Sequence, residues 1–171
     1  MKRAVALVLF ILAAAAIGTA ARSADALPIA QVTDSPAFDS AQDAAIAALA
    51  LIGRPVGRFE RGGAIVCHNG KYFYTTPVAG DEDALGFVIR KLKSDELVAI
   101  YHTHPVVDRS KLWIIDAFSK GDMRAALQLH TVSYLYVEGT HHILVFDPAA
   151  KTATRYAQSE TYGGREIPSN I

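Results

Sequence analysis

Two histidines with one residue between them end an apolar segment of the sequence, residues 96–104 (ELVAIYHTH). If this segment is a β-strand, residues two apart point to the same face, so His102 and His104 project together from its end. Two neutral imidazoles placed in this way can chelate a metal ion. A His-x-His pair is also often solvated or satisfied by hydrogen bonds in a core, so further ligands are needed to define a metal site.

A carboxylate that could complete such a site lies in residues 118–122 (FSKGD), which open an amphipathic segment. Ser119 followed three residues later by an acid is a capping arrangement, typical of a helix start. In the first helical turn, Asp122 would face back toward the histidines as a third ligand. Two imidazoles, one carboxylate and an open fourth position are typical of catalytic zinc. We expect the cap and ligand roles of Asp122 to compete.

Hydrolysis at a metal also needs a base that takes a proton from water. Glu60 is the candidate, because the two glycines that follow Arg61 give a backbone that a substrate can approach closely. Its alternative role is that of a surface residue paired with Arg58 or Arg61. Glu96 is too far away, because at about 3.3 Å per residue it lies roughly 20 Å from the end of the histidine strand.

The order of these elements resembles the motif of the JAB/JAMM (MPN-like) metalloproteases, which is an upstream Glu, then H-x-H-P, then S-x-x-D. Within that family, the chain resembles a bacterial branch of JAB-like domains of unknown function. That branch has E-x-G-G, a Tyr-rich strand ending in Thr-x-Pro, Y-H-T-H and F-S-x-x-D. The corresponding segments here are residues 60–63, 72–77, 101–104 and 118–122, within a similarity that spans roughly residues 59–156.

The resemblance implies an α+β fold with a JAB/MPN-like mixed sheet flanked by helices. It implies Zn²⁺ bound by His102, His104 and Asp122, with Glu60 as the general base and Ser119 helping to stabilise the oxyanion. The implied function is that of a zinc-dependent peptidase or isopeptidase, which hydrolyses an amide bond of a peptide or protein with metal-activated water. Zinc would polarise the carbonyl and lower the pKa of its water to about 7, while Glu60 passes the proton to the leaving amine.

One departure from the family motif lies between the histidines and the helix. Thirteen residues separate Pro105 from Ser119, a longer spacing than in the family motif. This loop, which carries Trp113, could form a substrate lid. If it instead displaces Asp122, the chain is a non-catalytic JAB-like binding or immunity-type module.

A third hypothesis is a cysteine hydrolase that uses Cys67 with His68 as its base. Cys67 is the only cysteine, so no intramolecular disulfide can form. It closes an apolar run that is typical of a buried strand, where cysteine behaves as a small hydrophobe. We favour that structural role.

The elements that must position these residues are mostly hairpins. Asn69-Gly70 predicts a two-residue turn between strands at 58–67 and 71–76. Helical spacing of apolar residues predicts a helix within 37–53, ended by Gly53 and Pro55. Further predictions are a strand at 96–104, a helix at 119–129, a hairpin of 132–137 with 142–146, and another strand at 152–156. Residues 79–93 could be a loop, a short strand or a helical turn.

The N-terminal residues have the layout of a secretory signal peptide. Lys2 and Arg3 precede eighteen uncharged residues, and small-x-small sites end at Ala20 and Ala26. We therefore predict a signal peptide at 1–26, and an uncleaved membrane anchor is the alternative. The remaining divisions are a leader and helix at 27–56, the JAB-like zinc hydrolase domain at 57–160 and a C-terminal tail at 161–171.

Composition bounds the partners that this protein can have. The 171 residues carry seventeen basic and seventeen acidic side chains, and removal of 1–26 would leave a net charge of −2. A mildly acidic domain without a basic run is not typical of a nucleic-acid binder. We therefore expect a protein that binds no nucleic acid. From the predicted signal peptide we expect it to be exported, periplasmic or secreted, with no stable membrane association after cleavage.

Overall fold

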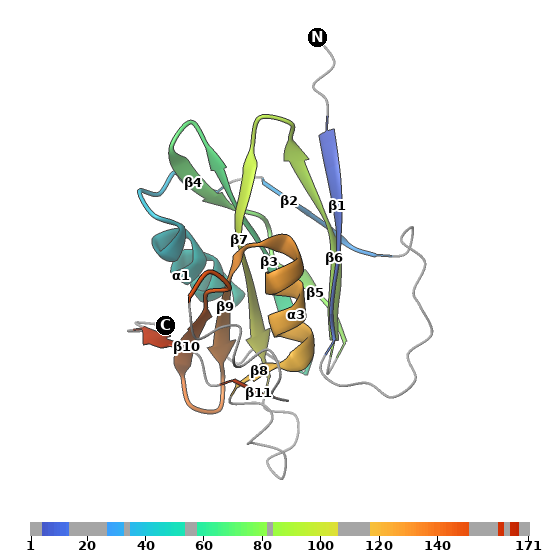
Figure 1. Cartoon of the computed structure of the whole chain (residues 1–171), viewed down its shortest axis with the longest axis vertical. Coiled ribbons are helices and arrows are strands. Elements are labelled where there is room, and N and C mark those ends of the chain that lie inside the picture. Colours follow the sequence, from blue (N-terminus) through green and yellow to red (C-terminus); the bar gives the residue numbers. More distant parts are fainter. Residues whose placement is uncertain are drawn as a thin grey trace.

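The computed structural model describes residues 5–13, 27–32, 35–53, 58–81, 84–105, 117–150, 161–162 and 165–167. Within these ranges the chain forms one domain of two helices and twelve strands (Figure 1). This confirms the α+β class with a mixed sheet. The JAB/MPN type remains a prediction.

The helices are α1 (Ala41–Ile52) and α3 (Lys120–Leu129). The strands are β1 (Val5–Ala13), β2 (Ile29–Gln31), β3 (Arg61–His68), β4 (Lys71–Tyr74), β5 (Val78–Ala79), β6 (Ala84–Leu92), β7 (Glu96–His104), β8 (Phe118–Ser119), β9 (Val132–Val137), β10 (His142–Phe146), β11 (Thr161–Tyr162) and β12 (Arg165–Ile167). None of the described helices is long and apolar enough to cross a membrane.

The main sheet has seven strands in the order β12-β10-β9-β7-β3-β4, and β5 also pairs with β3. All its neighbouring strands are antiparallel except β7 and β9, which are parallel. A parallel pair needs a long crossover connection, and α3 lies within the connection from β7 to β9. The crossover therefore brings the start of α3 back to the end of β7, where the histidines lie.

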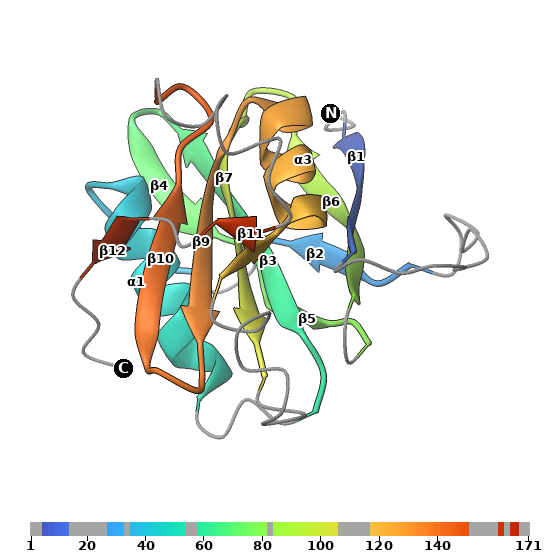
Figure 2. The same cartoon turned by 60° about the horizontal axis from the view of Figure 1, so that its bottom comes forward.

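The sheet is covered on both faces (Figures 1 and 2). Helix α1 packs on one face, where its Ala44, Ala45, Ala48 and Leu49 meet Ile65 of β3 and Tyr101 of β7. On the other face lie α3 and β6. There Leu85, Phe87 and Ile89 of β6 form a core with Ile100, and Phe118, Met123 and Ala126 pack against β9 and β10. The histidine strand is thus central and buried.

Most of the predicted elements are confirmed. Asn69 and Gly70 form the β3–β4 turn with positive φ values of 50° and 74°, as a two-residue hairpin turn requires. Ser40 caps α1, and Gly53 ends it with a φ of 75°. The strand predicted from residue 58 starts instead at Arg61. The unassigned residues 79–93 contain β6.

The ends of the chain join the sheets. β1 lies within the predicted signal peptide and pairs with β6 along all nine of its residues. In the predicted C-terminal tail, β11 pairs with β8, and β12 pairs with β10. Residues 14–26, the long loop at 106–116 and the predicted strand at 152–156 lie outside the described residues. The signal peptide and its cleavage stay predictions.

Candidate metal centre

Strand β7 fixes the directions of the two histidines. Successive side chains alternate between faces, so His102 and His104 point with Ile100 toward the face that α3 and β6 cover, while Tyr101 packs against α1. Both imidazoles are buried, at 0% and 4% exposure. Their ring centres lie 5.1 Å apart at 65°. The side chains therefore project as the adjacent pair that the spacing predicts.

Helix α3 brings Asp122 against both histidines. Asp122 Oδ1 lies 3.5 Å from His102 Nε2, and Oδ2 lies 3.4 Å from His104 Nε2. The carboxylate is 1% exposed. The geometry expected of the non-catalytic module, with a carboxylate displaced from the imidazoles by the long loop, is therefore not found.

Asp122 forms a complete helix cap and also faces both imidazoles. Ser119 Oγ accepts the Asp122 N–H at 3.2 Å, and Asp122 Oδ2 accepts the Ser119 N–H at 2.7 Å, which is a complete capping box. The cap uses Oδ2, which also faces His104, whereas Oδ1 faces His102. The same hydrogen bonds that start the helix therefore hold the carboxylate in a fixed orientation toward the imidazoles.

The three side chains fit a metal ion. One ligand atom from each of His102, His104 and Asp122 lies within 4.8 Å of the others. Bonds of roughly 2.1 Å to a tetrahedral zinc place ligand atoms about 3.4 Å apart, and each imidazole has one Asp122 oxygen near this distance, Oδ1 for His102 and Oδ2 for His104. A separation of 3.5 Å is long for a hydrogen bond, and neither ring nitrogen of His102 makes one within the described part of the chain. A buried imidazole without hydrogen bonds is unusual unless it binds something else.

The electrostatics of the centre favour the protonation states that a metal needs. Burial lowers the pKa of His102, and the opposing effect of Asp122 does not cancel it. Burial alone would raise the pKa of Asp122, but the adjacent imidazoles of His102 and His104 lower it further than burial raises it. The Ser119 N–H adds a donor to the charged carboxylate. Neutral imidazole and ionised carboxylate are the metal-binding forms.

Glu60 lies beside this group, directly before β3. Its Oε1 is 3.7 Å from His104 Nε2, and the residue is 3% exposed, so it is not the surface residue of the alternative interpretation. Two backbone hydrogen bonds hold it in place, from Glu60 N–H to Asp81 and from Gly80 N–H to Glu60, each 2.8 Å long. The structure thus brings Glu60 next to the His104 ring.

The glycines after Glu60 have a different role from the one proposed on sequence. A Cβ on Gly62 would lie 2.2 Å from the Tyr101 carbonyl oxygen and 2.9 Å from His102 Cα. A Cβ on Gly63 would lie 2.4 Å from Thr75 Oγ1. Both glycines therefore allow close packing around β3 rather than the approach of a substrate.

Ser119 lies within the same buried region, at 4% exposure. Its hydroxyl oxygen accepts the Asp122 N–H, and its own hydrogen remains able to donate. The neighbouring Phe118 ring, whose centre is 6.1 Å from that of His102, forms an apolar wall. Leu85 forms a second apolar wall next to Gly62. The sequence did not predict this contact, because residues 79–93 had no single predicted structure.

The remaining histidines and Cys67 lie elsewhere. Adjacent strand residues face opposite sides of a sheet, so Cys67 and His68 point apart. His68 Nδ1 lies 2.7 Å from Asp95 Oδ1 instead. His141 pairs with the Tyr136 hydroxyl at 3.2 Å, and His130 ends α3 with a φ of 54°. None of these described side chains joins the metal centre.

The group of His102, His104 and Asp122 can therefore hold a metal ion, and Glu60 stands next to it. The same donor types also suit other divalent metals, so the donor set does not by itself fix the identity of the ion. Comparisons of the chain with family models, curated proteins and solved structures found no match.

Proposed function

We propose that this protein is an exported zinc-dependent peptidase or isopeptidase of the JAB/JAMM type. The observation that carries the proposal is the convergence of four buried side chains from three separate segments: Glu60, His102 with His104, and Asp122. Burying two imidazoles and two carboxylates together costs folding free energy unless a bound cation or hydrogen bonds compensate. A metal ion is the simplest compensation.

A catalytic ion fits the donor set better than a structural one. Structural zinc sites in proteins are closed by four protein ligands, whereas catalytic sites have three and an open position. Three potential ligands converge here, and Glu60 Oε1 lies 3.7 Å from His104 Nε2. When bound, Zn²⁺ lowers the pKa of a water molecule to about 7 and polarises a carbonyl oxygen.

The side chains of the chain would then have distinct roles. His102, His104 and Asp122 hold the ion, and the Ser119 cap fixes the Asp122 carboxylate. Glu60 accepts a proton at its carboxylate and donates it to the leaving amine of the cleaved amide. The Ser119 O–H stabilises the negative charge that develops on the substrate carbonyl oxygen. Phe118 and Leu85 limit the access of bulk water to the imidazoles.

The substitution Glu60→Gln tests the proposed function. It removes the base but keeps the size and the hydrogen-bonding oxygen, so the protein should keep its metal and lose at least 100-fold in the rate of amide hydrolysis. New amino termini in a peptide library from a digested cell lysate, counted by mass spectrometry, provide the readout. Glu96→Gln is the control, because it changes an exposed acid of β7 far from the histidines. Undiminished cleavage by Glu60→Gln would remove Glu60 from the mechanism.

A further inference from the structure

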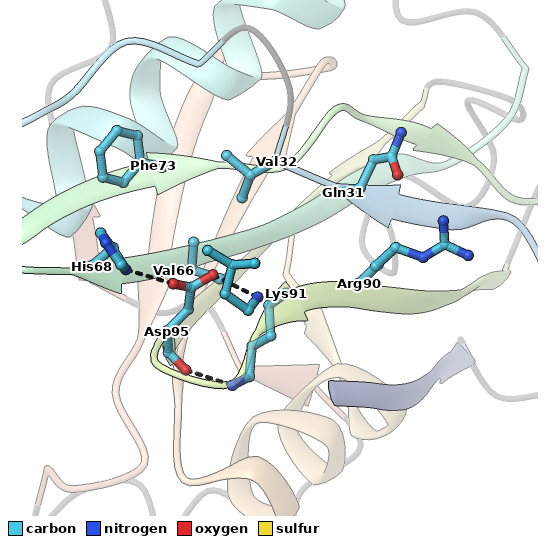
Figure 3. Close-up of a pocket in the computed structure, with 9 residues that line it drawn as sticks. Gln31, Val32, Val66, His68, Phe73, Arg90, Lys91 and Asp95 are labelled. Atoms are coloured by element: carbon cyan, nitrogen blue, oxygen red, sulfur yellow. Dashed lines mark hydrogen bonds and ion pairs between the residues drawn. The ribbon is translucent and has the colours of Figure 1, made fainter. Parts of the chain in front are cut away.

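A second feature of the structure is a pocket with a volume of about 280 Å³ between β2, the β3–β4 hairpin and the end of β6 (Figure 3). Its apolar wall consists of Val32, Val66, Phe73 and Leu92. Val66 is four residues along β3 from Gly62, which is about 13 Å at the rise of a strand. The pocket is therefore separate from the metal centre, and it plays no part in the proposed hydrolysis.

One end of the pocket is a fixed polar wall built around Asp95, which is 8% exposed. Its Oδ1 lies 2.7 Å from His68 Nδ1, and its Oδ2 accepts the Leu92 N–H at 2.8 Å. Lys91 Nζ donates to the Asp95 carbonyl oxygen. The Asn69 side-chain nitrogen lies 3.1 Å from His68 Nε2. The polar groups of this wall are therefore bonded to one another. The formal charges of Lys91 and Asp95 sum to zero.

The other end of the pocket carries Arg90 and Gln31. The two residues are direct partners in the parallel pairing of β6 with β2, so their side chains are neighbours. The Arg90 side chain makes no hydrogen bond or ion pair within the described ranges of the chain, and Figure 3 shows its guanidinium at the same end of the pocket as the Gln31 amide. The formal charges of Arg90, Lys91 and Asp95 sum to +1, with histidine counted as neutral.

We propose that this pocket binds a small carboxylate with an apolar body. The planar fork of Arg90 matches a carboxylate in two parallel hydrogen bonds, and the Gln31 amide can donate a third. The apolar body would lie against Val66 and Phe73. A volume of 280 Å³ is just below the roughly 300 to 1,000 Å³ of small-molecule pockets, so a fragment of one ring or a short chain fits. Inorganic phosphate would leave the apolar wall in contact with water.

Titrations of the full chain with 3-phenylpropanoate, followed by backbone NMR shifts, test this proposal. We expect saturable shifts at Gln31, Val66 and Leu92. The uncharged 3-phenylpropanamide, acetate and inorganic phosphate are the comparison probes, and each should bind at least tenfold more weakly. Arg90→Gln should weaken 3-phenylpropanoate binding at least tenfold. Lys93→Gln, which removes an exposed cation of the adjacent β6–β7 turn, should leave it unchanged.

Each other outcome would overturn the proposal. Equal binding of the amide would show that no carboxylate is recognised, and equal binding of acetate or phosphate would show that the apolar wall contributes nothing. Absence of shifts with the wild-type chain would also contradict it. Unchanged affinity in Arg90→Gln would exclude the guanidinium as the anchor. Because Arg90 is exposed, we expect this variant to keep the wild-type melting temperature, so a loss of binding would report on the site.

Discussion

At the scale of single residues, Asp122 is the most informative side chain of the molecule. One carboxylate accepts a hydrogen bond that starts α3 and faces two buried imidazoles. The sequence indicated both roles, but it suggested a conflict between them. Spacing shows which residues share a turn, whereas the choice of oxygen depends on the side-chain rotamer, which no spacing specifies.

Asp122→Asn should separate the two roles. Asparagine keeps the shape and an oxygen that can cap the helix, but it lacks the charge that binds a divalent cation. We expect zinc affinity, measured by competition with a chromophoric chelator, to fall at least tenfold. Asp43→Asn is the matched control, because Asp43 occupies the same position of the Ser40 cap in α1. Equal affinity in both variants would show that Asp122 is not a ligand.

At the scale of elements, the centre depends on a parallel crossover. β7 ends at the histidines, and the connection through α3 to β9 returns the start of α3 to that end. Both β7 and α3 could be predicted from sequence, β7 from its apolar run and α3 from its capping serine and amphipathic pattern. β6 could not, because Leu85, Phe87 and Ile89 alternate with Val88, which is also buried. A strand buried on both faces has no simple alternation, so the apolar wall beside Gly62 was not predicted.

The caps of the two helices offer a matched pair of substitutions. Ser119→Ala and Ser40→Ala each remove a side-chain acceptor from a helix N-terminus, so each should lower the free energy of unfolding by about 1 kcal/mol in metal-free protein. Only Ser119→Ala should also weaken zinc binding, because the lost Oγ acceptor holds the backbone of the ligand Asp122 at the start of α3, although the backbone N–H of residue 119 still donates to the carboxylate. Chemical denaturation and metal competition measure the two effects. Equal zinc affinity in both variants would contradict the coupling of cap and ligand.

At the scale of the whole molecule, the pairing of distant segments is what sequence patterns could not supply. The pairing of β1 with β6 and of β12 with β10 joins residues that are far apart in the chain. Local periodicity predicts the type of an element but not the strand with which it pairs. The sequence did predict the class of fold, the second hairpin and the two helices, since these depend on contacts within short segments.

The fate of β1 can be measured directly. If residues 1–26 are a signal peptide, protein recovered from outside the cytoplasm of an expressing bacterium should begin at Ala21 or Leu27 and lack β1. Intact mass and N-terminal sequencing give the cleavage point. A matched variant that lacks residues 1–26 should remain in the cytoplasm. An exported chain that still begins at Met1 would contradict cleavage and favour the membrane anchor.

Metal content tests the central claim most directly. Protein purified without chelators and analysed by inductively coupled plasma mass spectrometry should carry one zinc ion per chain. The double variant His102→Ala with His104→Ala should carry none, because one carboxylate cannot retain the ion. His142→Ala, which removes an exposed histidine at the start of β10, should keep the wild-type content. Equal zinc in wild type and double variant, or no metal in either, would contradict the assignment of this centre.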